Sequence, residues 1–247
     1  MSQKRKCRAV ILAAGKGTRM TGRVPKLLVE IHGKPIIKRV VEACQIPEVE
    51  KTYVVVGHRA GLTRDVLGDS CTFVTQRLQL GTAHALLQVR RRLENFRGDL
   101  LVVVGDSPFL TRPLLRRLLR AHRRSGSAAT FLTTEYPQPP PYARVIRDAR
   151  GKVANLLEEN QCTPEQKLIK EVSTTHYCFR SEIVLPLLSE IRKDNPKREY
   201  YLTDIIPILL RHSYEVRAVR VKNPRLVFGI NDLRDLQWAK KSVHSSS

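Results

Sequence analysis

A segment near the N-terminus combines backbone flexibility with positive charge. The apolar residues 9–14 lead directly into GKGTR at residues 15–19, and Lys26 follows shortly afterwards. Glycine lets backbone N–H groups approach an anion closely, and Lys and Arg add positive charge. The segment is therefore a candidate phosphate-binding loop, with an ordinary glycine turn as the alternative. It matches neither the P-loop pattern GxxxxGK[ST] nor the dinucleotide pattern GxGxxG.

A carboxylate follows a second apolar segment. Asp106 comes after the run at residues 100–104 and the intervening Gly105. Open α/β sheets bind ligands at the carboxyl ends of their strands, and Mg²⁺ prefers a few carboxylate oxygens completed by water and phosphate. Asp106 is thus a candidate magnesium ligand. The alternative is a helix N-cap before Ser107 and Pro108.

The first half of the chain alternates short apolar runs with helical patterns, which is typical of parallel βαβ units. We expect an α/β fold with a doubly wound, Rossmann-like, mostly parallel sheet. The expected strands cover residues 9–14, 52–56, 72–75 and 100–104, and the expected helices cover residues 36–43, 62–67, 82–96 and 113–124.

The pattern changes after Ser125. We expect strands at residues 128–134 and 173–179, a proline-rich loop at 136–141, a hairpin at 145–153, and helices at 183–192, 204–211 and 232–241. No linker separates two independent units. We therefore expect a single domain over residues 1–247, with a nucleotide-binding half at about 7–125 and an added substrate-facing lobe at about 126–241.

Five short motifs together resemble a known family. They are PKL at 25–27, QLGTAHA at 79–85, VGD at 104–106, REYYLTDII at 198–206 and GIN at 229–231. The set resembles the sugar-1-phosphate nucleotidyltransferases, and most of all the uridyltransferase domains of bifunctional enzymes that make UDP-N-acetylglucosamine. The resemblance runs from the first strand to about residue 240. The C-terminal β-helix of those enzymes, with its acetyltransferase activity, has no counterpart in this sequence.

The resemblance implies a reaction that suits these residue types. The phosphate of a sugar 1-phosphate attacks the α-phosphorus of UTP, and pyrophosphate leaves. Because the nucleophile is already an anion, the site needs charge neutralisation and in-line positioning rather than a general base. The resemblance assigns catalytic roles to Arg19 and Lys26, and it assigns Mg²⁺ binding to Asp106 and Asn231. For Asn231, capping of the following helix is the alternative, and the two roles could coexist.

The resemblance also assigns the two substrates to particular residues. The nucleotide would be bound by Leu12, Ala13, Ala14, Gly15, Gln76, Gly81, Thr82 and Gly105. Within this set a side-chain amide can pair with a pyrimidine edge. For Thr82, capping of the following helix is the alternative.

The sugar would be bound by Ala143, Glu158, Ser173, Tyr201 and Thr203. Here the match weakens, because the family's Tyr-Gly-Arg is Tyr142-Ala-Arg and its Asn-Thr-Gly is Ser173-Thr-Thr. N-acetylglucosamine 1-phosphate is the leading acceptor, and another sugar phosphate or a phosphorylated alcohol is the alternative.

The net charge of +21, from 44 Lys and Arg against 23 Asp and Glu, favours anionic partners. Residues 85–125 contain ten arginines and three acids, a local balance of +7. A nucleic-acid-binding protein is therefore the alternative from another functional class. Few aromatic residues and no RNA-binding motif argue against it. We expect UTP and a sugar 1-phosphate as partners, with a solvated basic surface elsewhere.

Other features set the cellular context. No apolar run reaches the roughly 18 to 20 residues that span a bilayer. The five cysteines are scattered and show no CxxC spacing, which argues against a disulfide framework and a zinc site. We expect a cytoplasmic protein that is a monomer or a weak dimer, since trimerisation in the bifunctional enzymes comes from the β-helix.

Overall fold

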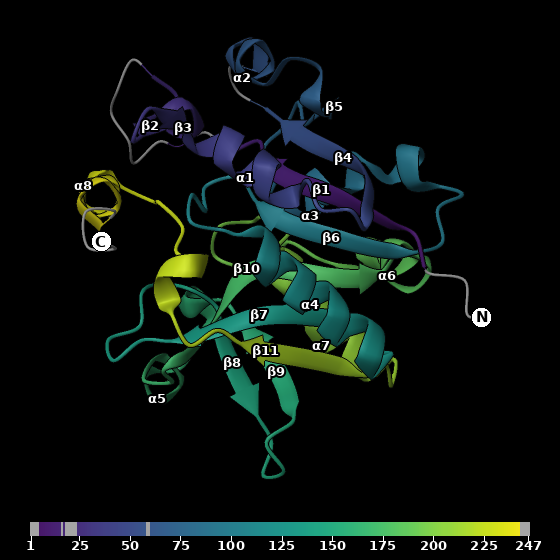
Figure 1. Ribbon diagram of the computed structural model, residues 1–247. Coiled ribbons are helices and arrows are strands. Elements are labelled where there is room, and N and C mark those ends of the chain that lie inside the picture. The colour runs from purple at the N-terminus through teal and green to yellow at the C-terminus, as the bar shows by residue number, and fades with distance from the viewer. Residues whose placement is uncertain (1–4, 16, 18–23, 58–59, 243–247) are drawn as a thin grey trace.

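The computed structural model describes residues 5–15, 17, 24–57 and 60–242. It contains a nine-stranded sheet whose main path runs β11-β7-β10-β6-β1-β4-β5 (Figure 1). The strands are β1 (Cys7–Ala13), β4 (Val49–Val56), β5 (Thr72–Thr75), β6 (Asp99–Val104), β7 (Ala129–Glu135), β8 (Arg144–Arg147), β9 (Val153–Leu157), β10 (Glu171–Arg180) and β11 (Val216–Arg220). Strands β1, β4, β5 and β6 pair in parallel, as do β7 and β11, whereas β10 is antiparallel to both β6 and β7. The expected mostly parallel α/β sheet is confirmed.

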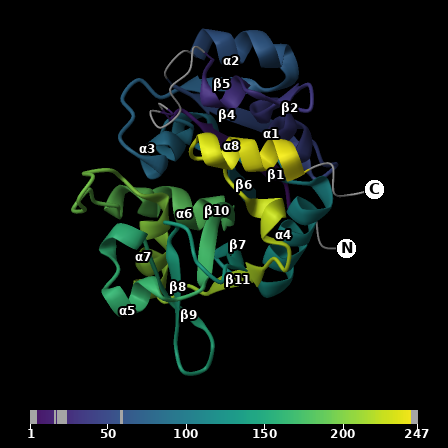
Figure 2. The same cartoon turned by 90° about the vertical axis from the view of Figure 1, so that its left-hand side faces the viewer.

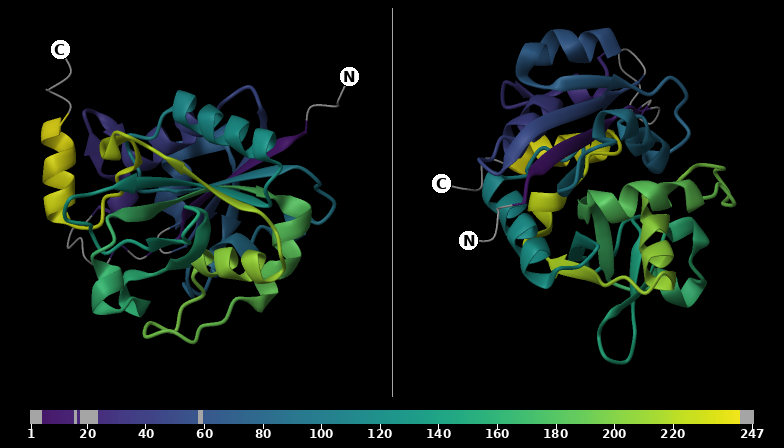
Figure 3. Two further views of the ribbon diagram at one scale, coloured as in Figure 1. Left: turned by 90° about the horizontal axis from the view of Figure 1, so that it is seen from below. Right: turned by 90° about the vertical axis from the view of Figure 1, so that its right-hand side faces the viewer.

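Helices cover both faces of this sheet. They are α1 (Ile36–Cys44), α2 (Ala60–Leu67), α3 (Thr82–Leu87), α4 (Arg112–Ser125), α5 (Pro164–Lys167), α6 (Ser181–Leu187), α7 (Ile205–Arg211) and α8 (Leu233–Lys241). Side chains alternate along β1, so that Ile11 packs with α1 and α4 while Val10 and Leu12 pack with α3, α6 and α7. Figure 3 shows the teal α4 and the yellow-green α7 on opposite faces of the sheet.

Helix α8 covers one end of the molecule. It lies beside α1 and the small hairpin of β2 (Glu30–Ile31) and β3 (Lys34–Pro35), as Figure 2 shows. Leu236 and Ala239 of α8 pack on Ile31, Ile36 and Ile230 in a separate apolar cluster. This packing carries the preceding chain back toward the first half of the sequence.

Two expected helices are shorter than the sequence pattern indicates. The helix expected at 82–96 ends at Leu87, and a 3₁₀ turn (Arg90–Leu93) follows. The i to i−3 hydrogen bonds of this turn keep Val89, Leu93 and Phe96 on the core. The helix expected at 183–192 likewise ends at Leu187 and continues as a 3₁₀ turn (Leu188–Glu190).

The second half adds elements to the same sheet. The expected hairpin is formed by β8 and β9, and its chain reverses at Gly151, whose φ is +74°. Strand β11 was not expected, because it is an edge strand of mixed exposure with a weak apolar pattern. Within the described part of the chain, no helix is long and apolar enough to cross a membrane.

Candidate active site

A cleft opens where β1 and β6 end side by side. Leu12 pairs with Val104 in this parallel register, so both chains turn outward at the same edge of the sheet. Gly105 donates its N–H to the Leu12 carbonyl at 2.9 Å. A Cβ at Gly105 would lie 3.2 Å from that of Ala13, so the residue type permits the close approach of the two chains. Asp106 is thereby placed beside the N-terminal loop.

Lys26 crosses from the N-terminal loop to the end of β6. Its Nζ donates to Asp106 Oδ2 at 2.6 Å and to the Ile230 carbonyl at 2.8 Å. The two charged side chains are only 16% and 22% exposed, so solvent screens this pair less than a surface ion pair. Asp106 does not cap a helix, since α4 begins later and has Thr111 as its N-cap.

The cleft has a volume of about 410 Å³ and contains most of the residues expected to bind nucleotide. Lys26, Asp106 and seven of the predicted nucleotide-binding residues line it: Leu12, Ala13, Ala14, Gly15, Gln76, Gly81 and Thr82. In the sequence, Gly105 lies between Val104 and Asp106, which both line the cleft, but Gly105 itself does not. Arg19 lies outside the described residues.

Gln76 is buried with its amide nitrogen already engaged. Its Nε2 donates to the Gly81 carbonyl at 3.1 Å and lies 2.8 Å from His84 Nδ1. These two contacts use both amide hydrogens and leave the amide oxygen as the group available to a ligand. Burial lowers the pKa of His84, which keeps its ring neutral beside this amide.

The loop at Gly81 is fixed by a distant segment. Tyr200 donates its N–H to the Leu80 carbonyl at 2.7 Å and accepts from Ala83 N–H at 2.9 Å. Gly81 has a φ of +111°, and a Cβ there would lie 2.5 Å from the Tyr200 carbonyl oxygen. Thr82 accepts from Leu202 N–H at 2.9 Å instead of capping α3, so the capping alternative for Thr82 is wrong.

Asn231 also reaches the site from the far end of the chain. Ile230 N–H donates to the Asp106 carbonyl at 3.0 Å, and a Cβ at Gly229 would lie 3.3 Å from Asp106 Oδ1. Asn231 donates through its side chain to the Gly229 carbonyl at 3.0 Å. Helix α8 is capped by Asp232, so Asn231 is not the N-cap.

A second cavity, of about 200 Å³, adjoins the first. The two share Thr82, Val104 and Asp106 as lining residues. Of the residues expected to bind sugar, Ala143, Glu158 and Ser173 line it, and so does Asn231. The fixed end of β6 therefore separates this candidate nucleotide cleft from a smaller polar cavity.

The remaining predicted sugar-binding residues do not line this cavity, although Thr203 contacts a residue that does. Thr203 donates its hydroxyl to Glu158 Oε1 at 2.8 Å, and Tyr201 accepts from Asn160 at 3.2 Å. Burial raises the pKa of Glu158, partly offset by the Thr203 hydrogen bond. Burial and the nearby Glu158 carboxylate raise the pKa of Asp204 to about 6.

Several lining residues were not singled out from the sequence. Gln79 and Glu199 line the candidate nucleotide cleft, and both belong to motifs that carry the family resemblance. Tyr142 lines the second cavity, and its hydroxyl donates to the Gly229 carbonyl at 3.3 Å. Thr175 also lines that cavity. Their places in or beside the family motifs were the sequence signal that could have identified them.

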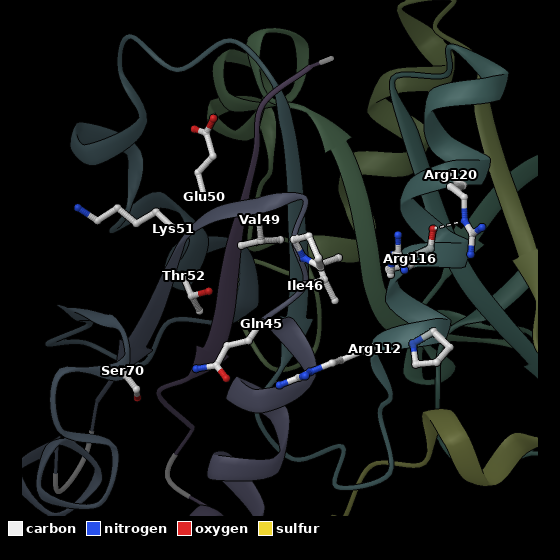
Figure 4. A pocket seen from close by; sticks show the side chains of 12 residues that line it. Gln45, Ile46, Val49, Glu50, Lys51, Thr52, Ser70, Arg112, Arg116 and Arg120 are labelled. Carbon is white, nitrogen blue, oxygen red and sulfur yellow. Dashed lines mark hydrogen bonds between the residues drawn. The ribbon is translucent and has the colours of Figure 1, made fainter.

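A larger hollow, of about 660 Å³, lies away from this site between β4 and α4 (Figure 4). Its arginines have partners. Arg112 donates to the Glu42 carbonyl, Arg116 pairs with Glu48 at 2.9 Å, and Arg120 donates to the Arg116 carbonyl. None of the predicted site residues that the structure describes lines this hollow.

Comparison with known proteins shows what this chain is similar to. Residues 9–176 match the family model described as the MobA-like NTP transferase domain. The chain is 44% identical over 234 residues to the bifunctional protein GlmU of Pelotomaculum thermopropionicum, covering 94% of this chain and 51% of the relative. It is 38% identical over 231 residues to GlmU of Gloeothece citriformis, covering 93% and 50%. The chain thus spans about half the length of these curated relatives.

Among solved structures, the fold is similar to a crystal structure of UDP-glucose pyrophosphorylase complexed with UDP-glucose. The TM-score is 0.76 at 17% sequence identity, with 98% of this chain and 100% of the other covered. This similarity supports a nucleotide-diphospho-sugar transferase fold, in agreement with the doubly wound α/β sheet expected from the sequence.

Proposed function

Because the chain belongs to the family of MobA-like NTP transferase domains, we propose that it transfers a uridylyl group from UTP to a sugar 1-phosphate. The leading acceptor is N-acetylglucosamine 1-phosphate, and the products are a UDP-sugar and pyrophosphate. The general chemistry, nucleotidyl transfer, follows from the family. The choice of UTP and of the acceptor rests on the residues described above.

One observation carries the proposal: Asp106 lines both of two adjoining cavities, and Lys26, which lines the first, is bonded to it. Transfer requires two phosphorylated substrates to meet end to end. A phosphate oxygen of the sugar phosphate attacks the α-phosphorus of UTP while the bond to the β-phosphate breaks, and pyrophosphate leaves with the bonding electrons. Lys26 lies where it can neutralise the crowded phosphates and the charge that builds on the leaving group.

The environment of Gln76 supports a uracil base. Its two amide hydrogens are engaged by Gly81 and His84, so its free oxygen can only accept a hydrogen bond. Uracil presents an N–H on its pairing edge, whereas cytosine presents an unprotonated ring nitrogen there. A cytosine base bound in the same orientation would place its ring nitrogen against the Gln76 oxygen, so that two acceptors face each other, and an unpaired buried group of this kind discriminates strongly.

The residues around Asp106 fit a magnesium ion. The Asp106 carboxylate and the Asn231 amide line the same cavity, and both offer the hard oxygen ligands that Mg²⁺ prefers. Within the described ranges, no group of three or more His, Cys, Asp or Glu side chains forms a conventional metal cluster. Two protein ligands suffice, because water and substrate phosphates usually complete a magnesium site. When bound, the ion would supply charge neutralisation and a template for the phosphates.

The test is pyrophosphate release from UTP, Mg²⁺ and N-acetylglucosamine 1-phosphate. We expect Lys26→Ala to lower kcat/KM by roughly 10²-fold to 10³-fold, because a preorganised charge is lost. Lys34→Ala is the matched control, since Lys34 pairs with Glu42 outside the cleft. A panel of other nucleotides, sugar phosphates and phosphorylated alcohols distinguishes the alternative acceptors. Release of no pyrophosphate from any pair would overturn the proposal.

A further inference from the structure

Strand β10 is interrupted where it borders the acceptor cavity. Its pairing with β7 runs from Ser173 opposite Thr133 directly to Tyr177 opposite Phe131. Three residues of β10 therefore face a single residue of β7, Leu132, which is a β-bulge. In a regular strand, only alternate side chains would face the cavity. The bulge instead lets three consecutive residues, 173–175, line it.

Thr175 stands out within this bulge because of its backbone. Its φ is +57°, in the left-handed region that a β-branched residue rarely adopts. The conformation is held on both sides, since Thr174 donates its hydroxyl to the Leu132 carbonyl at 3.2 Å and His176 is fully buried. Strained backbone of this kind persists where the surroundings enforce it, and it occurs preferentially at functional sites.

The side chain of Thr175 lies in a position to affect the acceptor cavity rather than the nucleotide cleft. The residue lines the 200 Å³ cavity together with Ala143, Ser173 and Glu158, and it does not line the nucleotide cleft. Glycine is the residue that a left-handed backbone favours, so the threonine methyl and hydroxyl occupy space that a glycine here would leave open. Ala143 adds a second Cβ to the same cavity, and it is 4% exposed.

Resting on the proposed function, we infer that Thr175 is a specificity-determining residue for the acceptor. Its side chain narrows the cavity and lowers the preference for a sugar 1-phosphate that carries an acetamido group over the plain hexose 1-phosphate. The small volume of the cavity makes this effect steric. One or two carbon-sized groups in such a pocket change discrimination by roughly tenfold or more.

The experiment compares kcat/KM for N-acetylglucosamine 1-phosphate and glucose 1-phosphate, with UTP as donor. Thr175→Gly should raise the ratio of the two values roughly tenfold, and Thr175→Ala should raise it in the same direction. The alanine variant removes the threonine methyl and hydroxyl but keeps a Cβ on the left-handed backbone. It therefore shows whether a change in the ratio comes from the space gained in the cavity or from the backbone strain that glycine would relieve. The KM for UTP should stay within about twofold, because Thr175 is outside the nucleotide cleft.

Ser213→Gly is the matched control. Ser213 also has a left-handed φ, +59°, but it is exposed and lines neither cavity. Its substitution should leave the ratio unchanged. An unchanged ratio in both Thr175 variants, with an active wild-type enzyme, would overturn this inference and leave the proposed function standing. A wild-type chain that is inactive with every acceptor would overturn both.

Discussion

At the residue scale, Lys26 and Asp106 neutralise each other in the cleft. Lys26 is held by Asp106 and by the Ile230 carbonyl, so its position is set by both halves of the chain. A buried charge without a partner would be costly, and the pair avoids that cost. A metal-bound nucleotide would provide new partners for both groups, with phosphates for Lys26 and a cation for Asp106.

Asn231 and Asp232 are neighbours with different roles, and substitution can separate them. Asp232 accepts from Arg234 N–H and Asp235 N–H at the start of α8, so Asp232→Ala should lower the free energy of unfolding by about 1 kcal/mol. Asn231→Ala should leave stability nearly unchanged and raise the Mg²⁺ concentration needed for half-maximal activity by roughly tenfold or more. Urea unfolding and magnesium titration of activity measure the two effects. If Asn231→Ala instead lowered the free energy of unfolding and left the magnesium requirement unchanged, Asn231 would have a structural role.

Asp204 links stability to pH. Burial and the Glu158 carboxylate raise its pKa to about 6, from 3.8. A carboxyl with a raised pKa in the folded state favours folding below the unfolded pKa, and this contribution is lost as the pH rises through the folded pKa. Asp204→Asn should therefore gain stability relative to wild type between pH 4 and pH 7, by about 2 kcal/mol after allowance for solvent screening. Urea unfolding at both pH values checks this, and a constant difference would contradict it.

At the element scale, the loop before α3 depends on a glycine pressed against another loop. Gly81→Ala should lower the free energy of unfolding by about 2 kcal/mol or more and raise the KM for UTP, because the new Cβ meets the Tyr200 backbone at 2.5 Å. Gly151→Ala is the matched control. Gly151 also has positive φ, +74°, but faces open space in the β8–β9 turn.

The control isolates the cost of backbone conformation. Gly151→Ala should cost about 1 kcal/mol and leave the KM for UTP unchanged. Equal effects of the two substitutions on stability and KM would mean that the contact with Tyr200 does not position the nucleotide loop. Thermal or urea unfolding, paired with steady-state kinetics, distinguishes these cases.

Elements with a strong local pattern could be predicted from the sequence. The leucines of α4 recur at helical spacing, and all four are buried; the strands ending at Ala13 and Val104 appear as apolar runs. These elements place the two loops that carry Lys26 and Asp106. The breaks after Leu87 and Leu187 were missed because a 3₁₀ turn preserves an apolar spacing close to that of a helix.

Contacts between distant segments could not be predicted from local pattern. Backbone hydrogen bonds connect Tyr200 to the loop at Gly81 and Ile230 to Asp106. In both cases the bonded residues lie more than one hundred positions apart in the sequence. The left-handed backbone of Thr175 is also invisible in the sequence, since threonine normally favours an extended strand. The family resemblance indicated which segments meet, but the geometry of their meeting comes from the fold.

At the scale of the whole molecule, the surplus positive charge is partly used within the fold. Arg123 of α4 pairs with buried Asp99 at 2.6 Å, and Arg116 pairs with Glu48. Arg117 donates to the Arg220 carbonyl at 2.9 Å. These contacts join α4 to neighbouring strands and loops, so several arginines of the basic stretch at residues 85–125 are bound within the fold.

The remaining surface charge leads to a last prediction. If anionic nucleotides are the partners, kcat/KM for UTP should fall as salt rises from 50 to 500 mM, because the surface charge speeds the diffusional encounter with UTP and salt screens that attraction.

Duplex and single-stranded nucleic acids should show no measurable binding at about 150 mM salt. An Arg116→Glu, Arg120→Glu variant tests where the charge acts, since both residues line the hollow beside α4 rather than the cleft. Fluorescence anisotropy with labelled DNA and RNA measures the binding. Affinity that survives at this salt concentration, falls steeply with further salt and is lost in the variant would restore the nucleic-acid hypothesis.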